Sequence, residues 1–171
     1  MRVRVARMLN LDLDLSGFYR MCRKEKRLRY VPRRGAGRFL SAGNLYEDVF
    51  KAICATNISW KQAVRGVNRI GALGQSSGES DLRAFPGPEE ILSVGPEQLS
   101  RVSRLGYRVP YLVAWAKRAM SNDAGYRAAE NGTLDREGFR KFFLSIRGIG
   151  PTTCRYLMML RGVADEIPLD S

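Results

Sequence analysis

The segment from Arg147 to Pro151 contains residue types that can bind an anion through the backbone. Gly148 and Gly150 stand one residue apart, so the chain can turn tightly and approach another molecule without a Cβ atom in between. Pro151 suits the first turn of a following helix, whose amide groups and positive dipole end attract negative charge. Ile149 can anchor the turn in the core. The segment predicts an anion site, although a plain helix corner with a glycine cap would use the same residues.

Other kinds of chemistry are excluded by what the chain lacks. It has no histidine, which removes nucleophiles activated by histidine and the commonest zinc sites. Its three cysteines, Cys22, Cys54 and Cys154, are too far apart in sequence for a disulfide framework or a closed metal site, and we expect buried free thiols. Any reaction must therefore use carboxylates, hydroxyls, lysines or backbone amides.

The charge of the chain points to a polyanionic partner. The 171 residues carry a formal net charge of +12, and 44% of them are hydrophobic, enough for one packed domain or two small lobes. Lysine and arginine displace counterions from a phosphate backbone, so nucleic acid is the first candidate; a basic but otherwise ordinary surface is the alternative. Residues 20–38 are the most basic stretch, and we expect an exposed loop there that lies against phosphates or serves only as a solvated linker.

The pattern of apolar residues predicts an all-α fold. Asn44 can cap a first helix from residue 45, which is interrupted at Asn57, and Ser59 with Gln62 forms a capping box for the next helix. A surface loop over residues 71–87 follows, and then come short helices beginning at Pro88 and Pro96. Further helices are expected at 109–120, 135–146 and 152–160, with a polar connection around residues 131–132. Strand-like alternation is confined to the first few residues.

We therefore divide the chain into a basic N-terminal segment, residues 1–43, and a helical domain, residues 44–171, with a helical hairpin at about 135–161. The N-terminus alternates arginine with apolar residues and has no signal-peptide core, and no run of residues is long and apolar enough to span a membrane. A cytoplasmic, nucleoid-associated or nuclear monomer is the expectation.

Several segments together resemble one protein family. Residues 144–160 (LSIRGIGPTTCRYLMML), followed by Ile167-Pro168-Leu169-Asp170, resemble the helix-hairpin-helix and Pro-x-Asp signature of the endonuclease III and 8-oxoguanine DNA glycosylase superfamily. Residues 45–70 are similar to its first barrel helices. Residues 105–120 resemble the Gly-Tyr-Arg helix of its alkylbase and 8-oxoguanine branches. The resemblance implies a helix-hairpin-helix glycosylase-like bundle without the usual C-terminal helices, as in a fragment or in a chain whose N-terminal segment supplies the missing packing.

The resemblance also implies contacts with double-stranded DNA. The backbone around the hairpin glycines would hold a phosphate, and the carbonyls of Leu144, Ile146 and Ile149 would hold a bridging monovalent cation. Thr56 and Asn57 occupy the positions that fill the gap left by an extruded nucleotide, although capping of the interrupted helix explains them equally well. The implied DNA-binding residues are Thr56, Asn57, Arg147, Gly148, Ile149, Gly150, Thr152 and Thr153.

Asp170 matches the catalytic carboxylate of the family, where it would stabilise the positive charge that develops on the deoxyribose when an N-glycosidic bond breaks. Without the resemblance, an aspartate near a chain end is simply a solvated charge. Family members with lyase activity carry a lysine where this chain has Thr152, and a hydroxyl cannot form a Schiff base. Lys141 is not placed to substitute. We therefore expect a monofunctional glycosylase that needs no cofactor, and the chain as given provides no iron-sulfur cluster.

Two questions stay open at this stage. The candidate aromatic residues for a base pocket are Trp60, Tyr107, Tyr111 and Trp115, and core packing is the favoured explanation for each. The base that would be removed, whether alkylated, oxidised or mismatched, is not specified. The alternatives to an enzyme are a non-catalytic helix-hairpin-helix DNA-binding protein, an inactive glycosylase fragment, and a helical protein-interaction module, which would leave the charge of +12 unexplained.

Overall fold

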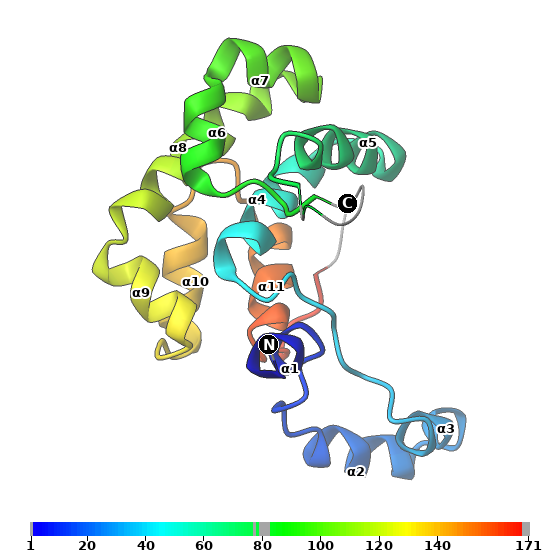
Figure 1. Cartoon of the computed structure of the whole chain (residues 1–171). Coiled ribbons are helices and arrows are strands. Elements are labelled where there is room, and N and C mark those ends of the chain that lie inside the picture. Colours follow the sequence, from blue (N-terminus) through cyan, green and yellow to red (C-terminus); the bar gives the residue numbers. More distant parts are fainter. Residues whose placement is uncertain (1, 77, 79–82, 169–171) are drawn as a thin grey trace. The chain divides into compact units, whose positions relative to one another are not determined.

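The structure, a computed structural model, describes residues 2–76, 78 and 83–168, with side chains from residue 5 onward. The chain divides into two compact units, Met1–Gly43 and Asn44–Ser171. Throughout the described residues the regular elements are helices, and the β-structure there is limited to one isolated bridge between Ser76 and Arg83. The expected all-α class is therefore confirmed (Figure 1).

The first unit is helical where the sequence suggested a loop. It contains α1 (Arg2–Met8), α2 (Ser16–Lys24), the 3-10 helix η1 (Lys26–Leu28) and α3 (Tyr30–Arg33). The expected exposed loop over residues 20–38 is thus wrong for most of its length, and so is the strand-like start. Arginine and lysine are good helix formers, and Pro32 lies in the first turn of α3, where proline is tolerated. Two apolar residues of this stretch, Cys22 and Val31, are buried, whereas Met21 and Leu28 are exposed.

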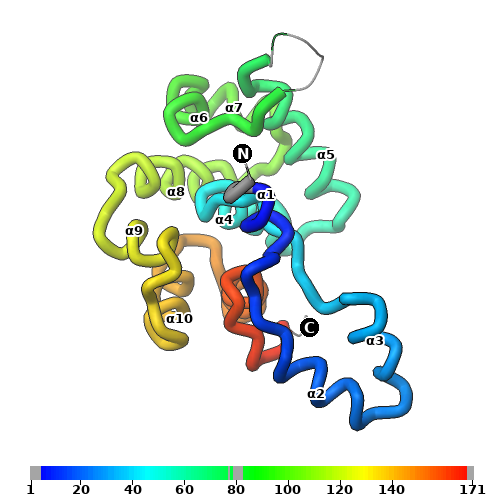
Figure 2. The backbone as a smooth tube through the Cα atoms, turned by 60° about the horizontal axis from the view of Figure 1, so that its bottom comes forward, coloured from blue at the N-terminus to red at the C-terminus, as the bar shows by residue number. Residues whose placement is uncertain are grey.

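The second unit is built around one buried helix, α4 (Leu45–Ala55), which packs against α5 (Trp60–Gly71), α8 (Val109–Ser121) and α11 (Pro151–Leu160). Figure 2 shows α4 and α8 lying between two groups of helices. One group holds α5, α6 (Pro88–Val94) and α7 (Pro96–Ser103); the other holds α9 (Ala124–Asn131), α10 (Arg136–Leu144) and α11. The 3-10 helix η2 (Gly106–Arg108) leads into α8.

Local signals place these helices close to their expected positions. The side chains of Asn44 and Ser59 cap α4 and α5, each by accepting a hydrogen bond from the backbone amide three residues later. Helix α9 was missed, because we expected only a polar connection before residue 135. Asp123 caps it by accepting from the amide of Tyr126, and the alanines of its sequence favour a helix.

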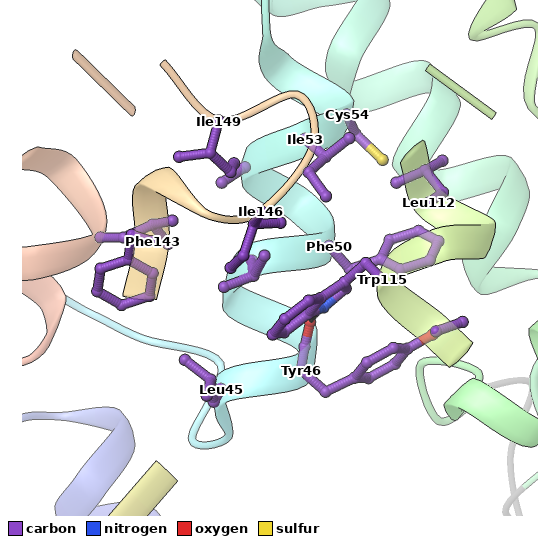
Figure 3. Packing of buried hydrophobic residues seen from close by; sticks show 14 of the residues in the cluster. Leu45, Tyr46, Phe50, Ile53, Cys54, Leu112, Trp115, Phe143, Ile146 and Ile149 are labelled. Carbon is purple, nitrogen blue, oxygen red and sulfur yellow. Dashed lines mark hydrogen bonds between the residues drawn. The ribbon is translucent and has the colours of Figure 1, made fainter. Parts of the chain in front are cut away.

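The core of this unit is apolar and aromatic (Figure 3). Leu45, Val49, Phe50 and Ile53 of α4 are completely buried, so this helix is covered on nearly all sides. The indole nitrogen of Trp115 on α8 donates a hydrogen bond of 2.9 Å to the carbonyl of Tyr46, which ties α8 to the first turn of α4.

The three cysteines are buried free thiols, as expected. Burial raises the pKa of Cys54 to about 12, so this thiol is neutral at physiological pH and is a packing group. In the part of the chain that the structure describes, no helix has the length and apolar character needed to cross a membrane.

Candidate nucleic-acid interface

The hairpin between α10 and α11 is fixed from the inside by two isoleucines. The side chains of Ile146 and Ile149 are buried, and Figure 3 shows them beside α4. The amide of Ile149 donates to the carbonyl of Ile146 at 3.1 Å, which closes the turn. At its start the hydroxyl of Ser145 accepts a 2.8 Å hydrogen bond from the guanidinium of Arg118 on α8. The turn is therefore held in place by buried side chains and by hydrogen bonds within the protein.

The two hairpin glycines are needed for different reasons. Gly148 has a φ of +93°, and a Cβ atom there would lie 2.6 Å from the ring of Tyr111, so both conformation and packing require glycine. Gly150 has an ordinary φ of −95°, and a Cβ atom there would meet nothing within 4 Å. Because Gly150 is exposed, its missing side chain leaves the backbone open to another molecule.

The N-terminus of α11 is favourable for a negative charge. Gly150 provides no side-chain cap, Pro151 is the first helical residue, and the first turn contains no acidic residue. Thr152 and Thr153 follow in that first turn and are half-buried. Arg147, exposed on the turn, adds a positive charge close to the positive end of the helix dipole. These features together suit an anion such as a phosphate.

A series of aromatic rings and guanidinium groups runs from the hairpin to η2. The guanidinium carbon of Arg147 lies 5.0 Å from the centre of the Tyr111 ring, which also contacts Gly148. Tyr111 packs edge to face against Tyr107 with 6.0 Å between ring centres, and Arg108 lies 4.4 Å from the Tyr107 ring centre. The hairpin and η2 are thus connected by direct side-chain contacts.

Arg108 extends this connection to the corner between α4 and α5. Its side chain is buried, and it donates 2.7 Å hydrogen bonds to the carbonyls of Thr56 and Asn57 and a 3.2 Å bond to the carbonyl of Leu105. A buried guanidinium keeps its charge and must find acceptors, so these carbonyls fix the corner firmly. Sequence analysis did not single out Arg108 as a bracing residue; its place in the Gly-Tyr-Arg segment was the available signal.

Thr56 and Asn57 have different roles in this corner. The hydroxyl of Thr56 donates to the carbonyl of Ile53 at 2.9 Å, so it caps the end of α4. Asn57 is exposed, has a left-handed φ of +48°, and its side chain has no hydrogen-bond partner among the described residues. The amide group of Asn57 is therefore available to interact with another molecule.

The four candidate aromatic residues divide into two pairs. Trp115 is only 1% exposed and belongs to the core, and Tyr111 packs over Gly148. Trp60 and Tyr107 are 78% and 54% exposed, so the expectation of core packing is wrong for these two. Both lie next to the corner that Arg108 holds.

The acidic group that organises the end of the described chain is Glu166. Its carboxylate accepts a 2.6 Å hydrogen bond from Nε of Arg155 on α11 and pairs with Arg136 on α10, which also pairs with Asp165. The hydrogen bond from Arg155 is the main reason that the pKa of Glu166 is lowered. This cluster holds residues 165–166 against both hairpin helices. Nothing in the local sequence pointed to Glu166, and Asp170, four residues later, lies outside the described residues.

No protein-family model matches the sequence, and no curated protein matches it. Many solved structures nevertheless share its architecture, among them the following three. The 8-oxoguanine glycosylase/lyase of Clostridium acetobutylicum, in complex with DNA containing cytosine opposite 8-oxoguanine, aligns over 97% of this chain with a TM-score of 0.77 and 16% identity. MBOgg1 in complex with a low-affinity DNA ligand aligns over 96% with a TM-score of 0.73 and 20% identity. The 3-methyladenine DNA glycosylase from Archaeoglobus fulgidus aligns over 93% with a TM-score of 0.65 and 24% identity.

The fold is that of the helix-hairpin-helix DNA glycosylases. This agrees with the resemblance found in the hairpin and in the two other segments. The chain spans 58%, 57% and 54% of the lengths of these three glycosylase structures, respectively.

Charge is unevenly distributed along the chain. Residues 1–43 contain twelve of the 29 basic residues and three of the 17 acidic ones, a net charge of +9 out of +12. Eight basic side chains between residues 20 and 34 are exposed: Arg20, Arg23, Lys24, Lys26, Arg27, Arg29, Arg33 and Arg34. Most of the attraction for a polyanion therefore comes from the first unit.

The different roles of the hairpin glycines lead to a first prediction. Gly148→Ala should lower the free energy of unfolding by about 1–3 kcal/mol, because the methyl group would clash with Tyr111 and φ is positive. Gly150→Ala should stay within about 0.5 kcal/mol of the wild type. Urea unfolding followed by circular dichroism measures both. Equal stability of the two variants would contradict the packing seen at Gly148.

A second prediction concerns Arg108. Arg108→Lys keeps the charge, but lysine lacks the planar fork with which arginine bonds the carbonyls of Thr56 and Asn57 at the same time. We therefore expect the free energy of unfolding to fall by about 2 kcal/mol. Arg101→Lys, at an exposed position on α7, is the matched control and should have little effect. Similar behaviour of the two variants in thermal and urea unfolding would show that Arg108 does not brace the corner.

Proposed function

We propose that this chain binds double-stranded DNA and removes a damaged or mismatched base by hydrolysing its N-glycosidic bond. The observation that carries the proposal is the glycosylase fold over nearly the whole chain, with an exposed glycine at the N-terminus of the second hairpin helix. A corner that presents Asn57 and a strongly basic first unit agree with a DNA substrate.

In the proposed binding mode the hairpin backbone from Gly148 to Thr153 contacts a phosphate, and Arg147 adds a charged contact. The carbonyls of Leu144, Ile146 and Ile149 would hold a monovalent cation. The residues fit such an ion because α10 ends at Leu144, which leaves the following carbonyls outside the helix. The Ile146 carbonyl accepts the amide of Ile149 and keeps a second lone pair.

The proposed chemistry needs one carboxylate. The bond between C1′ and the base nitrogen breaks, its electron pair leaves with the base, and positive charge develops on the sugar. Asp170 stabilises this charge and takes the proton of the water molecule whose oxygen bonds to C1′. Support comes from the residues ahead of it, because Glu166 is held by arginines of both hairpin helices, Arg136 and Arg155.

The proposed reaction stops at hydrolysis. Thr152, the second residue of α11, occupies the position of the lysine in lyase-competent members, and its hydroxyl cannot form an imine with C1′. One of the structures with this fold is a glycosylase/lyase. The threonine in place of the lysine supports a simpler product for this chain, which is an abasic site in an intact strand.

The first unit supplies non-specific affinity in this proposal. Six of its eight exposed basic residues between 20 and 34 are arginines, whose planar forks can bind phosphate oxygens in pairs. Contacts of this kind release counterions and do not read the base sequence. They would hold DNA on the protein while the second unit examines it.

The decisive experiment incubates the protein with duplexes that each carry one alkylated, oxidised or mismatched base, and then treats them with alkali. We expect alkali-dependent strand breaks on at least one duplex, reduced about 100-fold or more in Asp170→Asn. Asp12→Asn, an exposed aspartate of the first unit, is the matched control and should keep full activity.

Two outcomes of this assay would contradict the proposal. Strand breaks without alkali, together with a covalent protein–DNA adduct that borohydride traps, would overturn the argument from Thr152. Tight DNA binding without excision of any lesion would favour a non-catalytic helix-hairpin-helix DNA-binding protein.

Salt dependence tests the role of the first unit. Replacing Arg23 and Arg27 with glutamine should reduce the slope of log Kd against log salt concentration by about 2, if each contacts one phosphate. The double variant Arg101→Gln and Lys117→Gln removes the same charge from exposed positions of the second unit and should change the slope less. An equal change of slope in both double variants would mean that DNA binding depends on overall charge and not on the first unit.

A further inference from the structure

Trp60 is the most exposed large hydrophobic side chain of the described residues, at 78%. Tryptophan is usually well buried, and the other tryptophan of this chain, Trp115, is 1% exposed with its indole nitrogen hydrogen-bonded. A single exposed indole is common on protein surfaces, so its position must decide whether it has a role.

The position of Trp60 is fixed by the packing of α5. Trp60 is the first residue of this helix and follows Asn57 by three residues. The inner face of α5 is pressed against the segment before η2, since a Cβ atom at Gly66 would lie 2.7 Å from the side chain of Leu105. Side chains in a helix lean toward its N-terminus, so the indole leans toward the corner that Arg108 braces.

The outer face of α5 is basic. Lys61, Arg65 and Arg69 recur every four residues and so follow one side of the helix. The helix contains no acidic residue, and none of the three cations has an ion-pair partner among the described residues. An unneutralised row of positive charge beside an exposed indole is complementary to the phosphates and bases of a nucleic acid.

We propose that Trp60 stacks on a base that stays in the duplex next to the gap left by the extruded nucleotide, while Lys61 and Arg65 contact the adjacent phosphates. This inference rests on the proposed function, in which Asn57 fills that gap. A role in the pocket for the extruded base does not fit, because such a pocket encloses its ligand and Trp60 is open to solvent. Base removal from the stack leaves a neighbouring base face uncovered, and an indole face can replace the lost contact.

The test uses a duplex with a tetrahydrofuran abasic analogue, which has a gap but no glycosidic bond, and an intact duplex of the same sequence. Trp60→Leu should weaken binding to the abasic duplex about tenfold, in line with the effect of losing one stacked base. It should leave the affinity for the intact duplex within about twofold. Trp60→Phe is the matched variant, because it keeps an aromatic face and should restore most of the affinity.

Fluorescence provides a second readout, since Trp60 is the exposed one of the two tryptophans. The abasic duplex should protect it from acrylamide quenching, and the intact duplex should not. Equal binding of the wild type and Trp60→Leu to the abasic duplex would overturn the role of Trp60. The proposed function would still stand in that case, because the lesion assay tests it separately. An equal loss on both duplexes would assign Trp60 to general DNA contact and overturn stacking at the gap.

Discussion

The buried guanidinium of Arg108 is the interaction on which the arrangement of the interface depends. A buried arginine cannot shed its charge, so each of its N–H groups must face an acceptor. The acceptors are backbone carbonyls after α4 and before η2. Those of Thr56 and Asn57 belong to residues 52 and 51 positions earlier in the sequence. By satisfying Arg108 the chain fixes the left-handed corner at Asn57 and with it the starting point of α5.

The same constraint reaches the hairpin through aromatic packing. Arg108 lies over Tyr107, Tyr107 packs against Tyr111, and Tyr111 fills the space that a side chain at Gly148 would need. The corner and the hairpin are therefore linked by a continuous series of side-chain contacts.

The two units have different electrostatic characters. The first unit carries three quarters of the net positive charge in one quarter of the chain, and the second is nearly balanced. In the second unit, acidic residues are used to hold the structure, as when Glu166 pairs with arginines of both hairpin helices. Most of the excess positive charge is thus separate in sequence from the ion pairs that hold residues 165–166 against the hairpin helices.

The sequence by itself determined the features that depend on neighbouring residues: the capped helices of the second unit, the glycine turn before Pro151 and the resemblance of these segments to helix-hairpin-helix glycosylases. The capped helices and the turn follow from local hydrogen bonds and helical periodicity, and the resemblance follows from the motifs in residues 45–70, 105–120 and 144–160. Only the tertiary structure decided that Trp60 is exposed and Trp115 buried, that Arg108 braces the corner, and that Glu166 joins the hairpin helices. These properties depend on which helix faces meet and on contacts between residues far apart in the chain. The helices of residues 16–33 were missed for a related reason, since a dense run of arginines resembles a solvated loop until Cys22 and Val31 are seen to be buried.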